Sequence, residues 1–207
     1  FIPLAENLGL MEQLGKQVSE LAMSQFARCE KQLSNHMFVS INISNRQLIS
    51  SDFVSNLIKD IERYDVPPEK FKLEITESIA LLGIDRAREY LERLSNFGFK
   101  LSLDDFGTGY SSLAYLHELP IDEIKIDMSF VRRIHTPSGR IMLKTITDMG
   151  RALKMAVVAE GVESKEAADI LRDLGVGLLQ GYYFRKPGPK EDCLEYVQAC
   201  QAGHVQP

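Results

Sequence analysis

Residues 100–113 read Lys-Leu-Ser-Leu-Asp-Asp-Phe-Gly-Thr-Gly-Tyr-Ser-Ser-Leu, and the rest of the chain can be interpreted outward from them. Polar and apolar residues alternate through the first part, which predicts a strand up to Leu103. Two adjacent carboxylates, Asp104 and Asp105, follow the strand, and the glycines at 107 and 109 predict a tight loop that leads into a short helix. Once the strand has ended, both carboxylates can turn toward one site, where their hard oxygens suit Mg²⁺ or Mn²⁺. Alternatively, the pair only caps the turn.

The composition is that of a globular chain. It has 207 residues, of which 44% are hydrophobic and 26% are charged, so one domain over 1–207 with a single core is expected. The net charge of −5 argues against general binding of DNA, RNA or a membrane surface, each of which requires a basic face. The sequence contains no pattern typical of a signal peptide and no apolar run of transmembrane length, so neither feature is expected within these residues. Three cysteines without CxxC spacing and four scattered histidines argue against a zinc site.

Strands and helices alternate six times along the sequence. Strands are predicted at 37–44, 71–76, 99–103, 124–126, 155–159 and 176–179, and the main helices at 10–29, 52–64, 85–97, 139–153, 165–174 and 191–200. This order predicts an α/β fold with a parallel sheet, either an open doubly wound sheet or most of a TIM-type (β/α) barrel. The strand patterns favour the barrel, because one set of alternate residues is apolar and the other is polar.

Each predicted strand also ends in a polar side chain. The catalytic groups of a TIM barrel come from the C-terminal ends of several strands, so these side chains predict an oxygen-rich, metal-assisted site with one lysine. The strand-end residues are Asn42, Glu74, Asp104, Lys125, Glu160 and Gln180.

Several motifs resemble the EAL domain, a family of bacterial phosphodiesterases that open cyclic di-GMP to linear pGpG. The resemblance runs the whole length of the chain. It rests on Asn42-Ile-Ser, Glu74-Ile-Thr-Glu77-Ser, the stretch from Asp104 to Leu113, Pro120-Ile-Asp-Glu-Ile-Lys125-Ile-Asp127, Ala159-Glu160-Gly-Val-Glu163 and Gln180-Gly-Tyr.

The resemblance implies a site with two Mg²⁺ or Mn²⁺ ions. Asn42, Glu74 and Asp104 would hold the first ion. Asp104 and Asp105 would hold the second, so that Asp104 bridges the two ions. Glu160 would complete the shell of the second ion, directly or through water.

The resemblance also implies roles for three residues that are not ligands. Lys125 would orient or deprotonate the attacking water, and Gln180 would hold that water or the phosphate. Glu77 would brace the loop at 105–112, near a dimer interface. Simpler interpretations remain open: Lys125 could form an internal ion pair with Glu74 or Asp104, and Glu77 could be a helix N-terminal charge. Glu163 and Asp127 are expected to be structural charges.

The front of the sequence departs from the family pattern. The Glu-Ala-Leu segment, whose Glu is a ligand of the first ion in this family, and a further strand belong before Phe1. We therefore expect a barrel that is incomplete at its N-terminus, with six of eight strands, and the chain as given could be inactive for lack of this Glu. Two further functions stay open: a cyclic di-GMP receptor or regulatory dimerisation module that does not turn over substrate, and a different barrel enzyme in which Lys125 takes a proton from a carbon acid.

The expected partners are cyclic di-GMP, a second copy of the chain, and an upstream sensor or GGDEF-type domain. The expected location is the cytoplasm.

Overall fold

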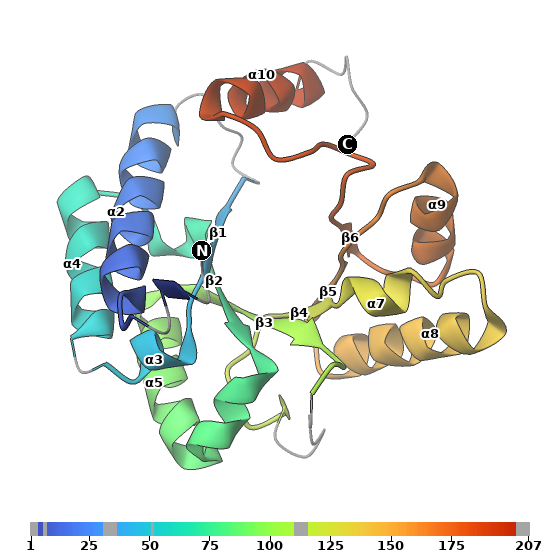
Figure 1. The fold of residues 1–207 in the computed structure, drawn as a ribbon, viewed down its shortest axis with the longest axis horizontal. Coiled ribbons are helices and arrows are strands. Elements are labelled where there is room, and N and C mark those ends of the chain that lie inside the picture. Colours follow the sequence, from blue (N-terminus) through green and yellow to red (C-terminus); the bar gives the residue numbers. More distant parts are fainter. Residues whose placement is uncertain (1–3, 6–7, 31–36, 51, 110–115, 202–207) are drawn as a thin grey trace.

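The computed structural model describes residues 4–5, 8–30, 37–50, 52–109 and 116–201. Within these ranges six parallel strands form one sheet in the order β1-β2-β3-β4-β5-β6, with β1 and β6 at its edges. The strands are β1 (Val39–Asn42), β2 (Phe71–Thr76), β3 (Lys100–Phe106), β4 (Glu123–Ile126), β5 (Ala156–Ala159) and β6 (Leu178–Leu179). The sheet curves into a half-barrel with its helices on the outside (Figure 1). The predicted α/β class and barrel-type architecture are therefore confirmed.

The main helices lie close to their predicted ranges. They are α2 (Met11–Cys29), α4 (Phe53–Tyr64), α5 (Ile84–Phe97), α8 (Pro137–Ala152), α9 (Lys165–Asp173) and α10 (Lys190–Gln201). The shorter ones are α3 (Asn45–Leu48), α7 (Met128–Val131) and the 3₁₀ segments η2 (Pro68–Lys70) and η3 (Glu77–Leu82). Every helix in the described ranges is too short or too polar to span a bilayer.

Side chains that start and stop the helices explain several of these boundaries. The Thr136 hydroxyl accepts a hydrogen bond from the backbone N–H of Gly139, and Ser164 does the same for Ala167 at the start of α9. Helix α5 ends at Gly98, whose φ of 116° is a left-handed conformation that glycine adopts without strain. The start of α8, the start of α9 and the end of α5 are therefore each explained by a residue that is favourable at that position.

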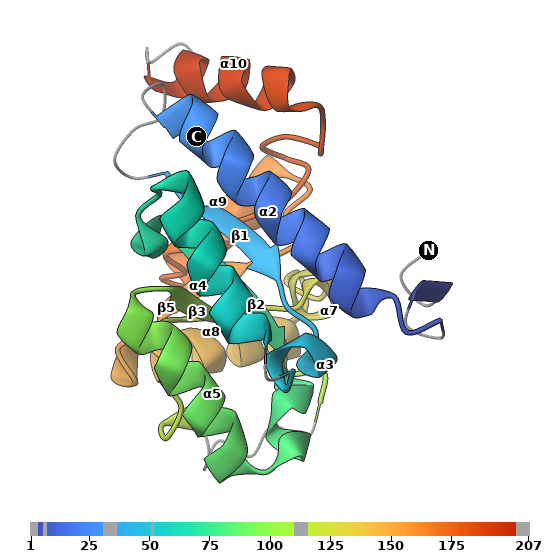
Figure 2. The same cartoon turned by 90° about the vertical axis from the view of Figure 1, so that its left-hand side faces the viewer.

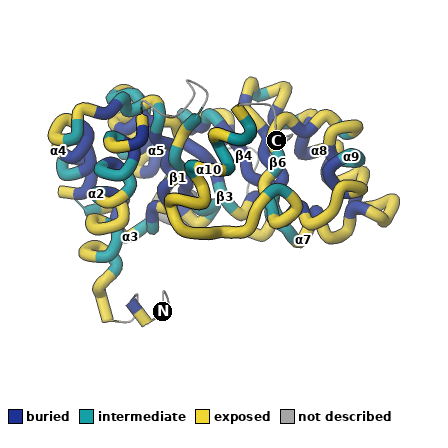
Figure 3. The backbone as a smooth tube through the Cα atoms, turned by 90° about the horizontal axis from the view of Figure 1, so that it is seen from above, coloured by how far each residue is buried: buried dark blue, intermediate teal, exposed yellow. Residues whose placement is uncertain are grey.

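The core lies between the sheet and the outer helices. In β2, the side chains of Phe71, Leu73 and Ile75 are buried on the side that faces these helices. Alternate residues of a strand point to opposite faces, so Lys72 and Glu74 point to the inside of the half-barrel. Figure 3 shows the buried residues along the strands and the inner sides of the helices, whereas α10 is largely exposed.

The half-barrel is not closed by strand pairing among the described residues. Helix α10 lies near the C-terminal end of α2 in both views (Figures 1 and 2), and the Lys190 Nζ atom donates a hydrogen bond of 2.8 Å to Gln25 Oε1. A cavity of about 330 Å³ lies inside the half-barrel and reaches from Phe38 and Lys72 to Lys125 and Gln180. The inner face of the sheet is therefore lined by charged side chains around open space.

Candidate metal centre

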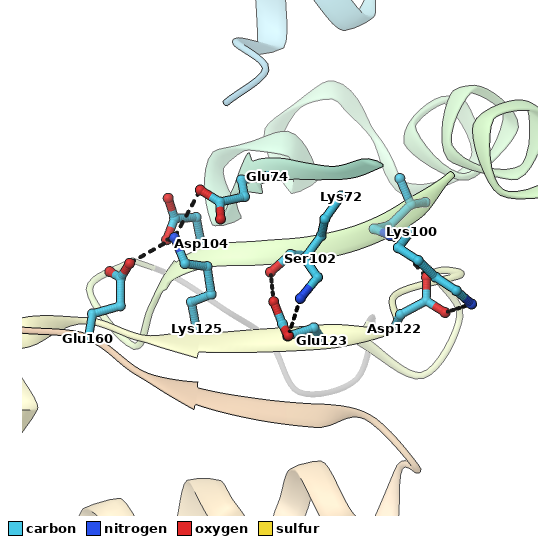
Figure 4. Close-up of polar contacts among 10 residues, drawn as sticks. Lys72, Glu74, Lys100, Ser102, Asp104, Asp122, Glu123, Lys125 and Glu160 are labelled. Atoms are coloured by element: carbon cyan, nitrogen blue, oxygen red, sulfur yellow. Dashed lines mark hydrogen bonds and ion pairs between the residues drawn. The ribbon is translucent and has the colours of Figure 1, made fainter. Parts of the chain in front are cut away.

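Lys125 is the central residue of the candidate site. It lies on β4, and its side chain is only 4% exposed. Its Nζ atom lies 2.9 Å from Glu74 Oε2, 3.1 Å from Asp104 Oδ1 and 2.7 Å from Glu160 Oε1 (Figure 4). The three carboxylates come from β2, β3 and the residue after β5, so one ammonium group connects four neighbouring strands. The ion pairs that were an open interpretation for Lys125 are thus present.

The register of the parallel strands explains this convergence. Glu74 lies level with Ser102, which places Asp104 two residues closer to the C-terminal edge than Glu74. On the next strand, Ser102 lies level with Glu123, so Lys125 reaches the height of Asp104. This stagger is characteristic of strands that tilt around a barrel axis. Side chains that stand at different positions along their own strands therefore meet at one point.

The two adjacent aspartates meet because of a bulge. The strand was predicted to end at Leu103, but β3 continues to Phe106, and this prediction was wrong. The β3–β4 register shifts between Leu103 and Phe106, and Asp105 has a left-handed φ of 56°. This local turn overrides the alternation of a regular strand. As a result, Asp104, Asp105 and Glu160 each place a carboxylate oxygen within 4.8 Å of the others.

Glu77 holds the chain that follows the two aspartates. Its carboxylate accepts hydrogen bonds from the backbone N–H groups of Gly107 (2.7 Å) and Gly109 (3.0 Å). A Cβ atom at Gly109 would lie only 2.6 Å from Glu77 Oε2, so the loop approaches this carboxylate closely. The rest of the loop and the short helix predicted near 111–112 lie outside the described residues. Over its described part, the loop contacts Glu77, as the resemblance to the EAL domain implies.

The centre carries more negative than positive charge. Burial alone would lower the pKa of Lys125, but its hydrogen bonds to Glu160 and Glu74 and the charge of Asp104 outweigh burial and raise that pKa. Burial raises the pKa of Glu160, and the neighbouring carboxylates oppose the effect of Lys125. Burial followed by the charge of Asp104 raises the pKa of Asp105. The two partners of this ion pair therefore have raised pKa values for different reasons: contacts with carboxylates raise that of Lys125, and burial raises that of Glu160.

This donor set fits divalent cations. Three carboxylates contact Lys125, and a fourth, that of Asp105, lies beside two of them, so hard oxygen atoms with excess negative charge gather at one place. Asn42, the last residue of β1, is the register partner of Glu74. The structure therefore contains an acidic cluster that is suited to bind metal.

The remaining predicted residues lie at the edge of this group. Gln180 follows β6, its side chain is exposed, and it lines the inner cavity together with Glu74 and Lys125. Asp127 caps α7 by accepting a hydrogen bond from the backbone N–H of Ser129 (3.0 Å), and its charge also contributes to the raised pKa of Asp105. The roles of Asn42, Gln180 and the ligands remain predictions.

Sequence reasoning missed a second charged layer inside the sheet. Lys72 Nζ lies 2.6 Å from Glu123 Oε2, and the Ser102 hydroxyl donates to Glu123 Oε1 at 2.9 Å. Glu123 precedes Lys125 by two residues, so the alternation that identified Lys125 could also have identified Glu123.

Comparison with known proteins identifies the family. A sequence model described as the EAL domain matches residues 1–187. PdeG of Escherichia coli, named a probable cyclic di-GMP phosphodiesterase, is 39% identical over 198 residues, which cover 95% of this chain and 39% of PdeG. MucR of Pseudomonas aeruginosa, named a bifunctional diguanylate cyclase/cyclic di-GMP phosphodiesterase, is 36% identical over 95% of this chain and 29% of MucR.

A solved structure supports the same assignment. The PaMucR phosphodiesterase in complex with c-di-GMP aligns with a TM-score of 0.89 and 36% identity, covering 93% of this chain and 78% of that one. The chain spans only 24% to 39% of the length of the curated relatives it matches. With the family model, the relatives and the fold in agreement, this chain belongs to the EAL domain family.

Proposed function

We propose that this domain is a metal-dependent phosphodiesterase that hydrolyses cyclic di-GMP to linear pGpG. The observation that supports it most is the cluster of Lys125, Glu74, Asp104, Asp105 and Glu160 at the C-terminal edge of the sheet. Active sites of TIM-type barrels lie at this edge. The choice of cyclic di-GMP as the substrate is inferred from the names of the relatives PdeG and MucR.

The carboxylates would bind two Mg²⁺ or Mn²⁺ ions. Asn42, Glu74 and Asp104 would hold one ion, and Asp104, Asp105 and Glu160 the other. When bound, such ions neutralise charge on the phosphate oxygens and lower the pKa of water. A net-acidic protein can then accept a dianionic nucleotide, because the acidic residues face cations instead of phosphates.

Lys125 and Gln180 would position the reacting groups. Lys125 would orient or deprotonate the attacking water, since its Nζ atom lies among the carboxylates that would hold the ions. Gln180 would hold the same water or the phosphate from the edge of the cavity. In the reaction, the water oxygen bonds to phosphorus and loses a proton, one P–O3′ bond breaks, and the released ribose oxygen gains a proton.

The partners of the domain are proposals as well. A second copy of the chain would pack near the loop that Glu77 holds, and a sensor or GGDEF-type domain would control the site. The two activities in the name of MucR and the small share of its length that this chain spans are in keeping with a multidomain setting.

The test replaces the bridging ligand with a neutral isostere. Asp104→Asn should reduce Mn²⁺ affinity by at least about 100-fold and abolish release of pGpG, because removing even a supporting residue typically costs 10–100-fold. The matched control is Asp85→Asn, which changes an aspartate on α5 whose side chain is 89% exposed. Unchanged hydrolysis by Asp104→Asn would refute the ligand assignment. Cyclic di-GMP binding by the wild type without release of pGpG would instead support the receptor function.

A further inference from the structure

A second buried ion pair lies next to the candidate metal centre, on the same inner face of the sheet. The side chains of Lys72 and Glu123 are only 10% and 4% exposed, and they meet across Ser102 of the strand between them. Figure 4 shows this group beside the contacts of Lys125, one step closer to the N-terminal ends of the strands. The pair is therefore a neighbour of the centre and not part of it.

On both β2 and β4, the residue in the second ion pair and the residue in the candidate metal centre carry opposite charges. On β2, Lys72 is followed two residues later by Glu74; on β4, Glu123 is followed by Lys125. Residues two apart on a strand share a face and are separated by about 6.5–7 Å. Glu123 therefore has two lysines within side-chain reach: Lys72 across the sheet and Lys125 on its own strand.

Each oxygen of the Glu123 carboxylate has a partner within this second ion pair and its neighbouring serine. One of its oxygens contacts Lys72 and the other accepts the Ser102 hydroxyl. Lys72 in turn lies with its Nζ atom 3.7 Å from the centre of the Phe38 ring, a cation–π contact on its other side. Lys72 is thus fixed between an aromatic ring and a carboxylate, and Glu123 is neutralised without Lys125.

We infer that Lys72 is a positioning residue for Lys125. By neutralising Glu123, Lys72 leaves the Lys125 ammonium free to remain among Glu74, Asp104 and Glu160, where the proposed hydrolysis needs it; the inference rests on that proposed function. Without Lys72, a buried carboxylate would face no cation, which is strongly unfavourable. Lys125 has a flexible four-carbon stem, so it would turn toward Glu123 and leave the centre.

A purely structural ion pair would behave differently. Its loss would lower stability but would leave the turnover of the folded protein unchanged, so that the single and double variants would have the same kcat as wild type. The two possibilities are separated by measuring kcat and KM for cyclic di-GMP at saturating Mn²⁺ in Lys72→Met, Glu123→Gln and the double variant. The control is Lys100→Met, which breaks an ion pair of 2.8 Å between Lys100, the first residue of β3, and Asp122, the residue before β4.

Lys72→Met should lower kcat by about 10-fold or more with little change in KM, the size expected for a residue that supports a catalytic group. Glu123→Gln in the Lys72→Met background should restore kcat to within about threefold of wild type, since no carboxylate then competes for Lys125. Lys100→Met should leave kcat unchanged. Wild-type kcat in Lys72→Met, or no rescue in the double variant, would overturn the inference.

A crystal structure of Lys72→Met shows the position of the Lys125 side chain, and this test does not depend on turnover. Lys125 Nζ should lie within hydrogen-bonding distance of Glu123; if it stays with Glu74, Asp104 and Glu160, the inference is wrong. If Lys72→Met does not fold, Lys72→Gln removes the charge but retains a donor, and the same two outcomes apply to it. If wild type hydrolyses no cyclic di-GMP, the proposed function fails, whereas the crystal structure still decides the position of Lys125.

Discussion

Glu77→Ala provides a sharp test of how the loop after β3 supports the metal centre. Glu77 is not among the residues whose oxygens gather at the centre, and its carboxylate instead accepts two backbone hydrogen bonds, from Gly107 and Gly109. Asp105 lies two residues before Gly107 and has a left-handed backbone. Removing the carboxylate should therefore release the segment that holds Asp105 in place, with no loss of a ligand.

The contacts set the size of the effect. Hydrogen bonds to a charged group contribute about 1.5–3 kcal/mol each, and Glu77 is partly exposed, so the two together hold the loop by about 3 kcal/mol. The apparent Mn²⁺ affinity is the intrinsic affinity multiplied by the fraction of molecules in which Asp105 is in place. A loss of about 3 kcal/mol of loop stability therefore limits the decrease in affinity to about 150-fold. We expect a decrease of about 10–100-fold in Mn²⁺ affinity.

The assay is calorimetric titration of Mn²⁺ into the wild type, Glu77→Ala and Glu77→Gln. Glu77→Gln retains one carbonyl acceptor and should fall between the other two. The matched control is Asp122→Ala, which removes a carboxylate that accepts the backbone N–H of Leu101 at the opposite end of β3 (2.9 Å). This control should lose stability but no Mn²⁺ affinity. If Glu77→Ala binds Mn²⁺ like wild type, Glu77 is only a charge at the start of η3.

Two further predictions concern the carboxylates themselves. Asp105→Gly should stabilise the ion-free domain against urea by about 0.5–1 kcal/mol, because its φ of 56° suits glycine, and should weaken Mn²⁺ binding; a loss of stability would show that the Asp105 side chain supports the fold. The raised pKa values of Asp105 and Glu160 mean that the folded state binds more protons than the unfolded state, so their contribution to stability is present below the ordinary values of 3.8 and 4.5 and is lost as pH rises through the raised ones. Mn²⁺ should accordingly raise the melting temperature more at pH 8 than at pH 5, and an equal rise at both would contradict this account.

The elements of the fold that have a regular spacing of apolar residues could be predicted from the sequence. The alternation of Lys72 and Glu74 with Leu73 and Ile75 gave both the strand and its inner face, and the helical spacing in α2 was sufficient to place that helix within one residue. The four-residue helices α3 and α7 were not predicted, because they are shorter than the window in which periodicity can be measured. Their caps, Ser44 and Asp127, were the available local signals.

The site was predictable in membership but not in geometry. The C-terminal ends of neighbouring parallel strands lie at one edge of the sheet, which brings Glu74, Asp104, Lys125 and Glu160 near one another. The inward-facing position of Glu123 could be inferred from the alternation, but the stagger between the strands could not, so its pairing with Lys72 across Ser102 was not predicted. That pairing joins strands more than 50 residues apart in sequence and depends on the stagger of three strands.

The bulge in β3 explains how one strand supplies two carboxylates to one site. A regular strand would direct Asp104 and Asp105 to opposite faces, and one of them would be buried against the helices. The left-handed φ of Asp105 avoids this, at a cost of about 1 kcal/mol for a residue other than glycine. Phe106, which is buried and paired in register with Ile126, returns the strand to the sheet beyond the bulge. The strain at Asp105 is thus held between a packed aromatic side chain and the loop bound by Glu77, which is the arrangement expected where a backbone is distorted to bind a ligand.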